Sequence, residues 1–162
     1  MKSKIGFCTI ITADYLPFAA SLQTSLYRIA HDLELHILIV DERGEELTSN
    51  YSDLKKYRLT DFDRKFNEHT NLIITKYQNE SDKLRWSLKP VFIKFLIDSG
   101  LEKVIYTDPD TYYYNDFEFL FDELDKYSIL LTPHWRSSDP KKDRANFDLS
   151  FVGGLFNGGF IG

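Results

Sequence analysis

The chain alternates between short, continuous runs of apolar residues and segments in which apolar residues recur every three or four positions. The runs at 5–11, 35–40 and 103–107 are typical of strands that are buried on both faces of a sheet. Between the first two runs, apolar residues recur at helical spacing at Phe18, Leu22, Leu26 and Ile29. This order of strand, helix and strand, with short connections, predicts a right-handed βαβ unit.

The rest of the chain continues this alternation. Ser87 suits the N-cap of a helix that has Pro90 in its first turn and ends before Gly100. The other expected elements are one or two short helices within 47–69, a strand at 72–75, a helix at 116–124, a strand at 129–132, a polar loop at 133–150 and a strand at 155–161. The pattern predicts one α/β domain, 1–162, with an open, mixed and mostly parallel sheet flanked by helices. Such sheets bind ligands at the carboxyl ends of their strands.

Composition narrows the classes of protein that fit. Of the 162 residues, 43% are hydrophobic and 28% are charged, which is ordinary for a globular domain. The net charge of −5 argues against nucleic acid as the main partner, and the single cysteine, Cys8, excludes an internal disulfide. No apolar run approaches the ~20 residues that a membrane span needs, and no signal peptide is evident. We therefore expect a cytoplasmic protein without a transmembrane segment, either free or peripheral to a membrane.

Two carboxylates follow directly after the apolar run at 103–107. Asp108 and Asp110 flank Pro109, which stiffens the turn between them. This arrangement suits Mg²⁺ or Mn²⁺, which prefer a few carboxylates together with phosphate oxygens. The same spacing recurs at 61–63, in a stretch that reads as a solvated helix, so the bare pattern is weak. The plain alternative for Asp108 and Asp110 is a solvated turn at the end of a strand.

Four segments carry a resemblance to a known family: Arg85–Pro90 (RWSLKP), Lys103–Thr111 (KVIYTDPDT), Leu130–His134 (LLTPH) and Phe156–Gly162 (FNGGFIG). In this order they resemble GT-A fold glycosyltransferases of family 8, the glycogenin and lipopolysaccharide galactosyltransferase type. The resemblance implies that Asp108 and Asp110 hold Mn²⁺ or Mg²⁺ on the diphosphate of a nucleotide sugar, usually UDP-linked. It implies transfer of the sugar to a glycan, lipid or protein acceptor, because a dication stabilises the departing diphosphate.

The resemblance also implies contacts with the nucleoside. Tyr15 stands where the family has a tyrosine that stacks on uracil, and its alternative role is packing at a helix entrance. Thr12 matches the position of a family acidic residue that contacts the base or the ribose. Asp41, after the second expected strand, is an alternative partner for that part of the nucleotide, or a plain turn residue.

Further residues are implied to lie near the phosphates, the sugar and the acceptor: Lys89, with Arg85 as a weaker version of the same idea, then His134, Trp135, Asn157 and Gly158. Each also has a structural interpretation. Lys89 could be a surface residue of a helix turn, and His134 could simply end a strand. Trp135 could pack in the core. The glycine suits a bulged strand, since small residues allow close approach of the backbone.

The chain departs from the family in its length. In the family, roughly as much chain again follows Gly162, and it carries a histidine that ligates the metal together with residues near the anomeric carbon. We therefore expect the acceptor half to be absent, catalytic residues to lie beyond Gly162, and transfer by this chain to be slow or lacking. An exposed apolar edge at 155–161 would favour self-association.

Three other functions were weighed against transfer. A catalytically incomplete sugar-nucleotide-binding module is the strongest of them. A haloacid-dehalogenase-type phosphatase requires Thr or Val at the position of Tyr112, so this class is disfavoured. A nucleotidyltransferase requires a glycine-rich, arginine-containing loop after its first strand, and the segment 12–15 (TADY) is not such a loop.

Overall fold

A six-stranded mixed sheet forms the centre of the protein. The computed structural model describes residues 4–41, 43, 54–63, 68–134, 141 and 153–162. The strands are β1 (Ile5–Ile11), β2 (Glu34–Ile39), β3 (Lys55–Arg58), β4 (Lys103–Thr107), β5 (Leu131–Pro133) and β6 (Phe156–Ile161). Their order is β3-β2-β1-β4-β6-β5. The first four in this order run parallel, whereas β6 is antiparallel to both of its neighbours, which confirms the predicted fold class.

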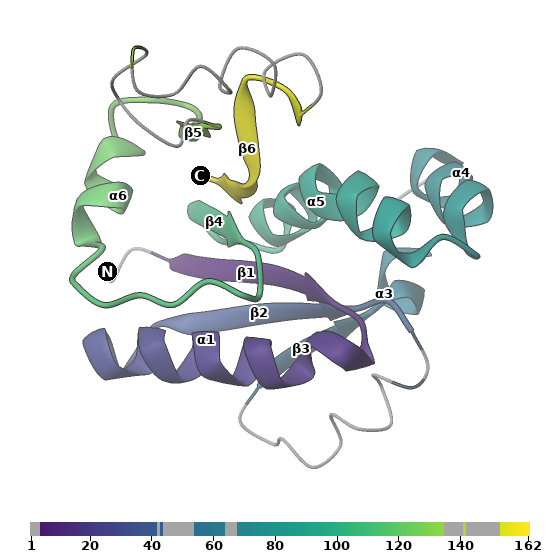
Figure 1. Cartoon of the computed structure of the whole chain (residues 1–162), viewed down its shortest axis with the longest axis horizontal. Coiled ribbons are helices and arrows are strands. Elements are labelled where there is room, and N and C mark those ends of the chain that lie inside the picture. The colour runs from purple at the N-terminus through teal and green to yellow at the C-terminus, as the bar shows by residue number, and fades with distance from the viewer. Residues whose placement is uncertain (1–3, 42, 44–53, 64–67, 135–140, 142–152) are drawn as a thin grey trace.

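Helices cover both faces of the sheet. They are the 3-10 helix η1 (Ala13–Tyr15), α1 (Leu16–Ile29), α3 (Leu59–Asp63), α4 (Glu68–Tyr77), α5 (Ser81–Asp98) and α6 (Glu118–Glu123). Figure 1 shows α1 on one face of the sheet and α5 on the other, with α4 beside α5. Every helix among the described residues is too short or too polar to cross a lipid bilayer.

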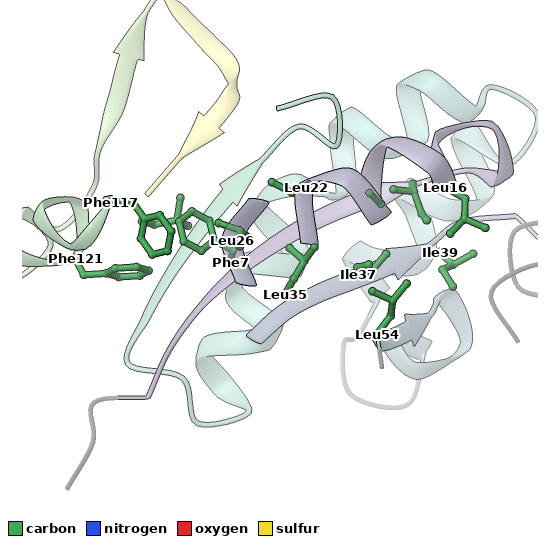
Figure 2. Packing of buried hydrophobic residues seen from close by; sticks show 13 residues of the cluster. Phe7, Leu16, Leu22, Leu26, Leu35, Ile37, Ile39, Leu54, Phe117 and Phe121 are labelled. Carbon is green, nitrogen blue, oxygen red and sulfur yellow. The ribbon is translucent and has the colours of Figure 1, made fainter. Parts of the chain in front are cut away.

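Alternate residues of β1 and β2 feed two separate cores. On the α1 side, leucines of the helix face strand residues of β2 (Figure 2): Leu16, Leu22 and Leu26 oppose Leu35, Ile37 and Ile39. Phe7 of β1 packs edge-on against Phe117 at 5.0 Å between ring centroids, which closes this core towards α6. On the α5 side, Leu88 and Phe92 pack against Cys8 and Tyr106. Because these strands are buried on both faces, their sequences are continuous apolar runs rather than alternating ones.

The strands predicted at 5–11, 35–40 and 103–107 agree with β1, β2 and β4 to within a residue. The apolar face predicted for α1 contains one wrong member, since Phe18 is 50% exposed. The strand predicted at 72–75 is wrong, because these residues belong to α4. Ile73 and Ile74 pack there against the α5-side core, so tertiary contacts override the short β-branched run.

Two further elements differ from the prediction. Helix α5 begins at Ser81 rather than after Ser87, because its buried stripe already starts at Leu84, and Pro90 therefore lies inside the helix. Strand β3, at Lys55–Arg58, was not predicted, because its sequence KKYR has no apolar alternation. It is the edge strand beside β2, and lysines at an edge discourage pairing with other chains.

Strand β6 is an inner strand. It pairs with β4 on one side and with β5 on the other. The segment 155–161 was predicted to be an exposed edge that favours self-association. This prediction of an exposed edge is wrong, because β6 is paired on both sides. Most of the polar loop expected at 133–150 lies outside the described residues.

Candidate functional site

A small cavity lies at the carboxyl ends of β1 and β4, where an open α/β sheet is expected to bind its ligand. Its volume is about 150 Å³. The residues that line it and carry chemistry are Tyr15, Asp82, Arg85, Lys89, Tyr106, Asp108 and Asp110. They come from η1, from the first half of α5, from β4 and from the turn after β4. The fold therefore brings together residues that are up to 95 positions apart in the sequence.

Two larger hollows lie elsewhere. One, of about 490 Å³, is lined by Ile97, Glu102 and Lys103, and so opens at the amino end of β4. The other, of about 540 Å³, is lined by Asp32, Leu33 and Glu34 at the amino end of β2. Open α/β sheets bind ligands at the opposite edge, so we take the smaller cavity as the candidate site.

Asp108 is held by two hydrogen-bond donors on one oxygen. The Lys89 ammonium lies 2.9 Å from Asp108 Oδ1, and the Tyr106 hydroxyl donates to the same oxygen at 2.8 Å. Burial, and then the neighbouring carboxylate, raise the pKa of Tyr106, so its hydroxyl remains a donor. Tyr106 lies in β4 and Asp108 follows the strand directly. The strand therefore fixes the position of the Asp108 backbone, and the Tyr106 hydroxyl orients its carboxylate.

Lys89 is almost entirely enclosed, with 8% of its surface exposed. Besides Asp108, its ammonium donates to the carbonyl of Gly158 at 2.8 Å and lies 4.7 Å from the centroid of the Tyr106 ring. A buried ammonium requires such partners, because desolvation without them is costly. Lys89 therefore links α5, β4 and β6 at the candidate site, and the surface interpretation of this lysine is wrong.

Strand β6 passes close over Asp108 at Gly159. The Asp108 amide donates to the Gly159 carbonyl at 2.8 Å, and a Cβ atom at position 159 would lie 2.8 Å from Asp108 Oδ2. Asn157 does not reach into the cavity, and its side-chain oxygen accepts the Gly159 amide at 2.9 Å. Gly158, which was the predicted ligand contact, contributes its carbonyl to Lys89. The requirement for a glycine thus falls on position 159.

The donor set suits a hard cation. Asp108 and Asp110 both line the cavity, with the buried Pro109 between them, and the Thr111 amide closes the turn on the Asp108 carbonyl at 3.1 Å. Carboxylate oxygens are the ligands that Mg²⁺ and Mn²⁺ prefer. Among the residues that the structure describes, however, no group of three or more His, Cys, Asp or Glu is arranged to hold a metal. A cation held by these two carboxylates would need phosphate or water oxygens to complete its shell.

Tyr15 and Arg85 form a stacked pair at the other wall. The guanidinium carbon of Arg85 lies 4.2 Å from the centroid of the Tyr15 ring, and Arg85 also pairs with Asp82 one turn earlier in α5. The Arg85 Nε is buried and has no hydrogen-bond partner among the described residues. One face of the ring that was predicted to stack on a base is therefore already covered by a cation.

Thr12 and Asp41 support the turn that carries Tyr15 and do not line the cavity. The Thr12 carbonyl accepts the Tyr15 amide at 3.0 Å, and both carboxylate oxygens of Asp41 lie 3.1 Å from the Ala13 amide. The structure thus favours the turn interpretation for Asp41, and it places the backbone of Thr12 in the same turn. Substitutions at Thr12 or Asp41 would therefore affect a ligand only indirectly, by moving η1 and with it Tyr15.

His134 does not line the cavity either. It is exposed, and its amide donates to the Leu155 carbonyl at 3.0 Å, next to the end of β5. Its ring lies beside Gly153, where an added Cβ would be 3.1 Å from His134 Cε1. Trp135, its predicted neighbour at the sugar, lies outside the described residues.

Four residues at the cavity or against Asp108 were not predicted as site residues: Asp82, Trp86, Tyr106 and Gly159. Tyr106 could have been found, because residues two apart in a strand face the same side, and it precedes Asp108 by two. The choice between two adjacent glycines needs the register of β6 on β4. Trp86, 60% exposed at the rim of the cavity, lies on a helix turn that was predicted to precede the helix.

Fold and site together define an α/β protein with a mixed open sheet and an acidic turn after its central strand. The chain is similar to the uncharacterized protein YfnF of Bacillus subtilis (strain 168), with 27% identity over 159 residues, covering 96% of this chain and 51% of YfnF. It is also similar to the uncharacterized protein YfnD of that bacterium, with 25% identity over 164 residues, covering 99% of this chain and 49% of YfnD. The chain therefore spans about half the length of the curated relatives it matches. No family model matches it.

Proposed function

We propose that this chain forms the nucleotide-sugar-binding part of a metal-dependent glycosyltransferase that uses a UDP-linked donor. The observation that carries the proposal is the cavity at the end of β4, which the carboxylates of Asp108 and Asp110 line together with the cations of Lys89 and Arg85. A diphosphate needs positive charge, and its metal needs carboxylates. The four motif segments noted in the sequence support the same class.

The residues of the chain would divide the work on the nucleotide diphosphate. Asp108 and Asp110 would hold Mn²⁺ or Mg²⁺, which when bound supplies charge neutralisation for the departing diphosphate. Lys89 and Arg85 supply further positive charge, and the buried Nε of Arg85 has a hydrogen bond left to donate. Tyr15 offers an aromatic ring beside that guanidinium for the uracil or its ribose.

The size of the cavity sets what can enter it. At about 150 Å³, it is smaller than the ~300–1,000 Å³ of sites that enclose a drug-sized ligand, and it suits a diphosphate with its cation. The nucleoside and the sugar would then lie at its rim. Trp86 and Tyr15 are the aromatic residues there, so they are the surfaces on which a ring could pack.

A binding module without transfer activity is the second candidate. The observation that favours it is that, among the described residues, no third His, Cys, Asp or Glu joins Asp108 and Asp110 in a group that could hold a metal. Both candidates predict the same nucleotide site, and they differ only in whether sugar is transferred.

Calorimetry with UDP, GDP and ADP, each with and without Mn²⁺, tests the proposal. We expect UDP to bind most tightly and to bind much more weakly when Mn²⁺ is removed. The variant Asp110→Asn should lose the metal-dependent part, whereas Asp61→Asn, at the second Asp-x-Asp match, should keep it. Equal binding of UDP with and without metal would overturn the proposal. A radiolabelled transfer assay from UDP-sugars then separates the enzyme from the binding module.

A further inference from the structure

The Asp108 carboxylate, which is proposed to bind metal, is paired with a cation of the protein itself, the Lys89 ammonium. We propose that Lys89 competes with the metal for Asp108, and that the diphosphate releases this competition by drawing the ammonium to itself. This inference rests on the proposed function, which it deepens by assigning Lys89 the coupling between metal and nucleotide.

The contacts of Lys89 show why it is a strong competitor. Its ammonium has three partners, in β4, in the turn after it and in β6: the ring of Tyr106 at 4.7 Å, Asp108 Oδ1 at 2.9 Å and the Gly158 carbonyl at 2.8 Å. Tyr106 donates to the same Asp108 oxygen at 2.8 Å, so Oδ1 already has two donors. Its stem lies buried in α5, which keeps the ammonium at this position. With this ion pair formed, the charge of Asp108 is balanced.

A dication entering alone meets this ammonium. It must share Asp108 with a positive charge that is largely shielded from water, where like charges repel more strongly than at an exposed surface. Breaking the pair without a new partner would leave Lys89 buried and unpaired, which is also costly. Both routes weaken the binding of metal in the absence of nucleotide.

A diphosphate changes this balance. It brings negative oxygens into a cavity that Lys89 and Asp108 both line, so the ammonium gains a partner within reach of its flexible end. The carboxylate is then released for the metal, and the two ligands strengthen each other by the same factor, as linkage requires. The site would thus bind metal tightly only when the nucleotide is present.

This account predicts an effect of unusual sign. Removing a cation from a phosphate site normally weakens binding of every ligand. Here Lys89→Met, which keeps the buried stem, should tighten the binding of Mn²⁺ alone. The same variant should weaken the coupling between Mn²⁺ and UDP, because the residue that responds to the diphosphate is gone.

Electron paramagnetic resonance of free Mn²⁺, titrated with protein in the absence of nucleotide, tests the first effect. We expect the dissociation constant for Mn²⁺ to fall about tenfold or more in Lys89→Met, since a like charge next to the metal has been removed. The control is Lys94→Met, which removes a charge from the same helix at an exposed ion pair with Asp98. It should change the constant less than twofold. An unchanged or weaker Mn²⁺ affinity in Lys89→Met would overturn the inference.

The same titrations with UDP, corrected for the complex that Mn²⁺ and UDP form in solution, test the coupling. The factor by which UDP strengthens Mn²⁺ binding should drop at least about fivefold in Lys89→Met and remain in Lys89→Arg. Lys89→Gln serves as a second neutral variant, and thermal unfolding verifies that each one folds. If the parent binds Mn²⁺ and UDP cooperatively but the neutral variants show the same factor, the role of Lys89 is wrong and the proposed function stands. If the parent binds neither ligand, both proposals fall.

Discussion

Asp108 is positioned by neighbours from three elements that meet only in the folded sheet. Lys89 of α5 and Tyr106 of β4 hold one oxygen, and the backbone of Gly159 in β6 runs past the other. Such a carboxylate is preorganised, because its rotamer is fixed before any ligand arrives. A change at any of these neighbours should therefore alter binding at the proposed metal site.

At the residue scale, Gly159→Ala tests this preorganisation. The new methyl would lie 2.8 Å from Asp108 Oδ2, so the carboxylate must move away from its two donors. We expect Mn²⁺-dependent binding of UDP to weaken by about 1–3 kcal/mol, the usual cost of overpacking. Gly158→Ala is the matched control, since no atom lies within 4 Å of a Cβ there. Isothermal titration of both variants decides, and equal losses would contradict the account.

A second prediction concerns Tyr15. Its ring is covered on one face by Arg85, so a base would stack on the opposite face or on the guanidinium itself. Tyr15→Ala should weaken UDP binding by about 1–3 kcal/mol, by analogy with base stacking on aromatic residues. Tyr27→Ala, an exposed tyrosine farther along α1, should have no effect. The measurement is calorimetry of UDP, GDP and ADP with both proteins. If Tyr15→Ala binds each nucleotide as tightly as the parent does, Tyr15 has no role in base recognition.

The role of a residue could be predicted where it depends on the neighbouring sequence, and not where it depends on tertiary contacts. Asp108, Asp110 and Lys89 were identified because they follow a buried strand or lie in a recognisable segment. Thr12 was expected at the ligand, and Asp41 either at the ligand or in a turn; the Thr12 carbonyl accepts the Tyr15 amide and the Asp41 carboxylate accepts the Ala13 amide. Which of two nearby polar groups reaches the backbone and which reaches the ligand depends on tertiary geometry that the local sequence does not contain.

At the scale of elements, β2 and the edge strand β3 share a polar network around one buried histidine. His36 of β2 is 2% exposed, shares a hydrogen bond of 2.9 Å with the Tyr57 hydroxyl of β3, and lies 3.5 Å from Glu34. Lys55 of β3 pairs with the same glutamate at 2.6 Å. Burial first, and then the Lys55 ammonium, lower the pKa of His36 to about 4, whereas Glu34 opposes this shift. His36 is therefore neutral in the folded protein.

This network predicts a pH dependence of stability. An unfolded histidine has a pKa of about 6.5, so as the pH falls the unfolded chain takes up the proton first. The contribution of His36 is complete above about pH 6.5 and is lost as the pH falls towards 4. We expect the free energy of unfolding in urea to drop by roughly 2 kcal/mol between pH 7.5 and pH 5.

The variant His36→Phe should remove most of that drop, because it removes the titrating group. His31→Gln is the matched control, since this histidine is exposed near the end of α1. A parent-like pH dependence in His36→Phe would show that other groups cause it.

Elements were predictable where a pattern was both long and buried. Strands β1, β2 and β4 and helix α1 satisfy this condition, and their positions agree with the sequence. Strand β3 and the segment 72–75 do not, because the first is a charged edge and the second is a short run inside a helix. The start of α5 differs from the prediction because the buried stripe begins at Leu84, before Ser87 and Pro90, which together are typical of a helix N-terminus.

At the scale of the whole molecule, ligand binding should stabilise the entire chain. A ligand that binds only the folded state at a hundred times its dissociation constant adds about 2.7 kcal/mol. For a domain of this size, that corresponds to a rise in Tm of roughly 5–10 °C. We expect this rise in differential scanning fluorimetry with Mn²⁺ and UDP together, a much smaller rise with Mn²⁺ alone, and none in Asp110→Asn with either. A full rise in Asp110→Asn would place the ligand elsewhere.

The central claim is that the turn after β4 binds a metal together with a nucleoside diphosphate. Paramagnetic broadening tests it most directly, because Mn²⁺ broadens the amide signals nearest to it in the nuclear magnetic resonance spectrum of the ¹⁵N-labelled chain. With substoichiometric Mn²⁺ and excess UDP, we predict that Asp108, Asp110 and Gly159 broaden first, while the signals of 61–63 remain. Broadening centred on 61–63, or on the hollows at the amino ends of β2 and β4, would contradict the account.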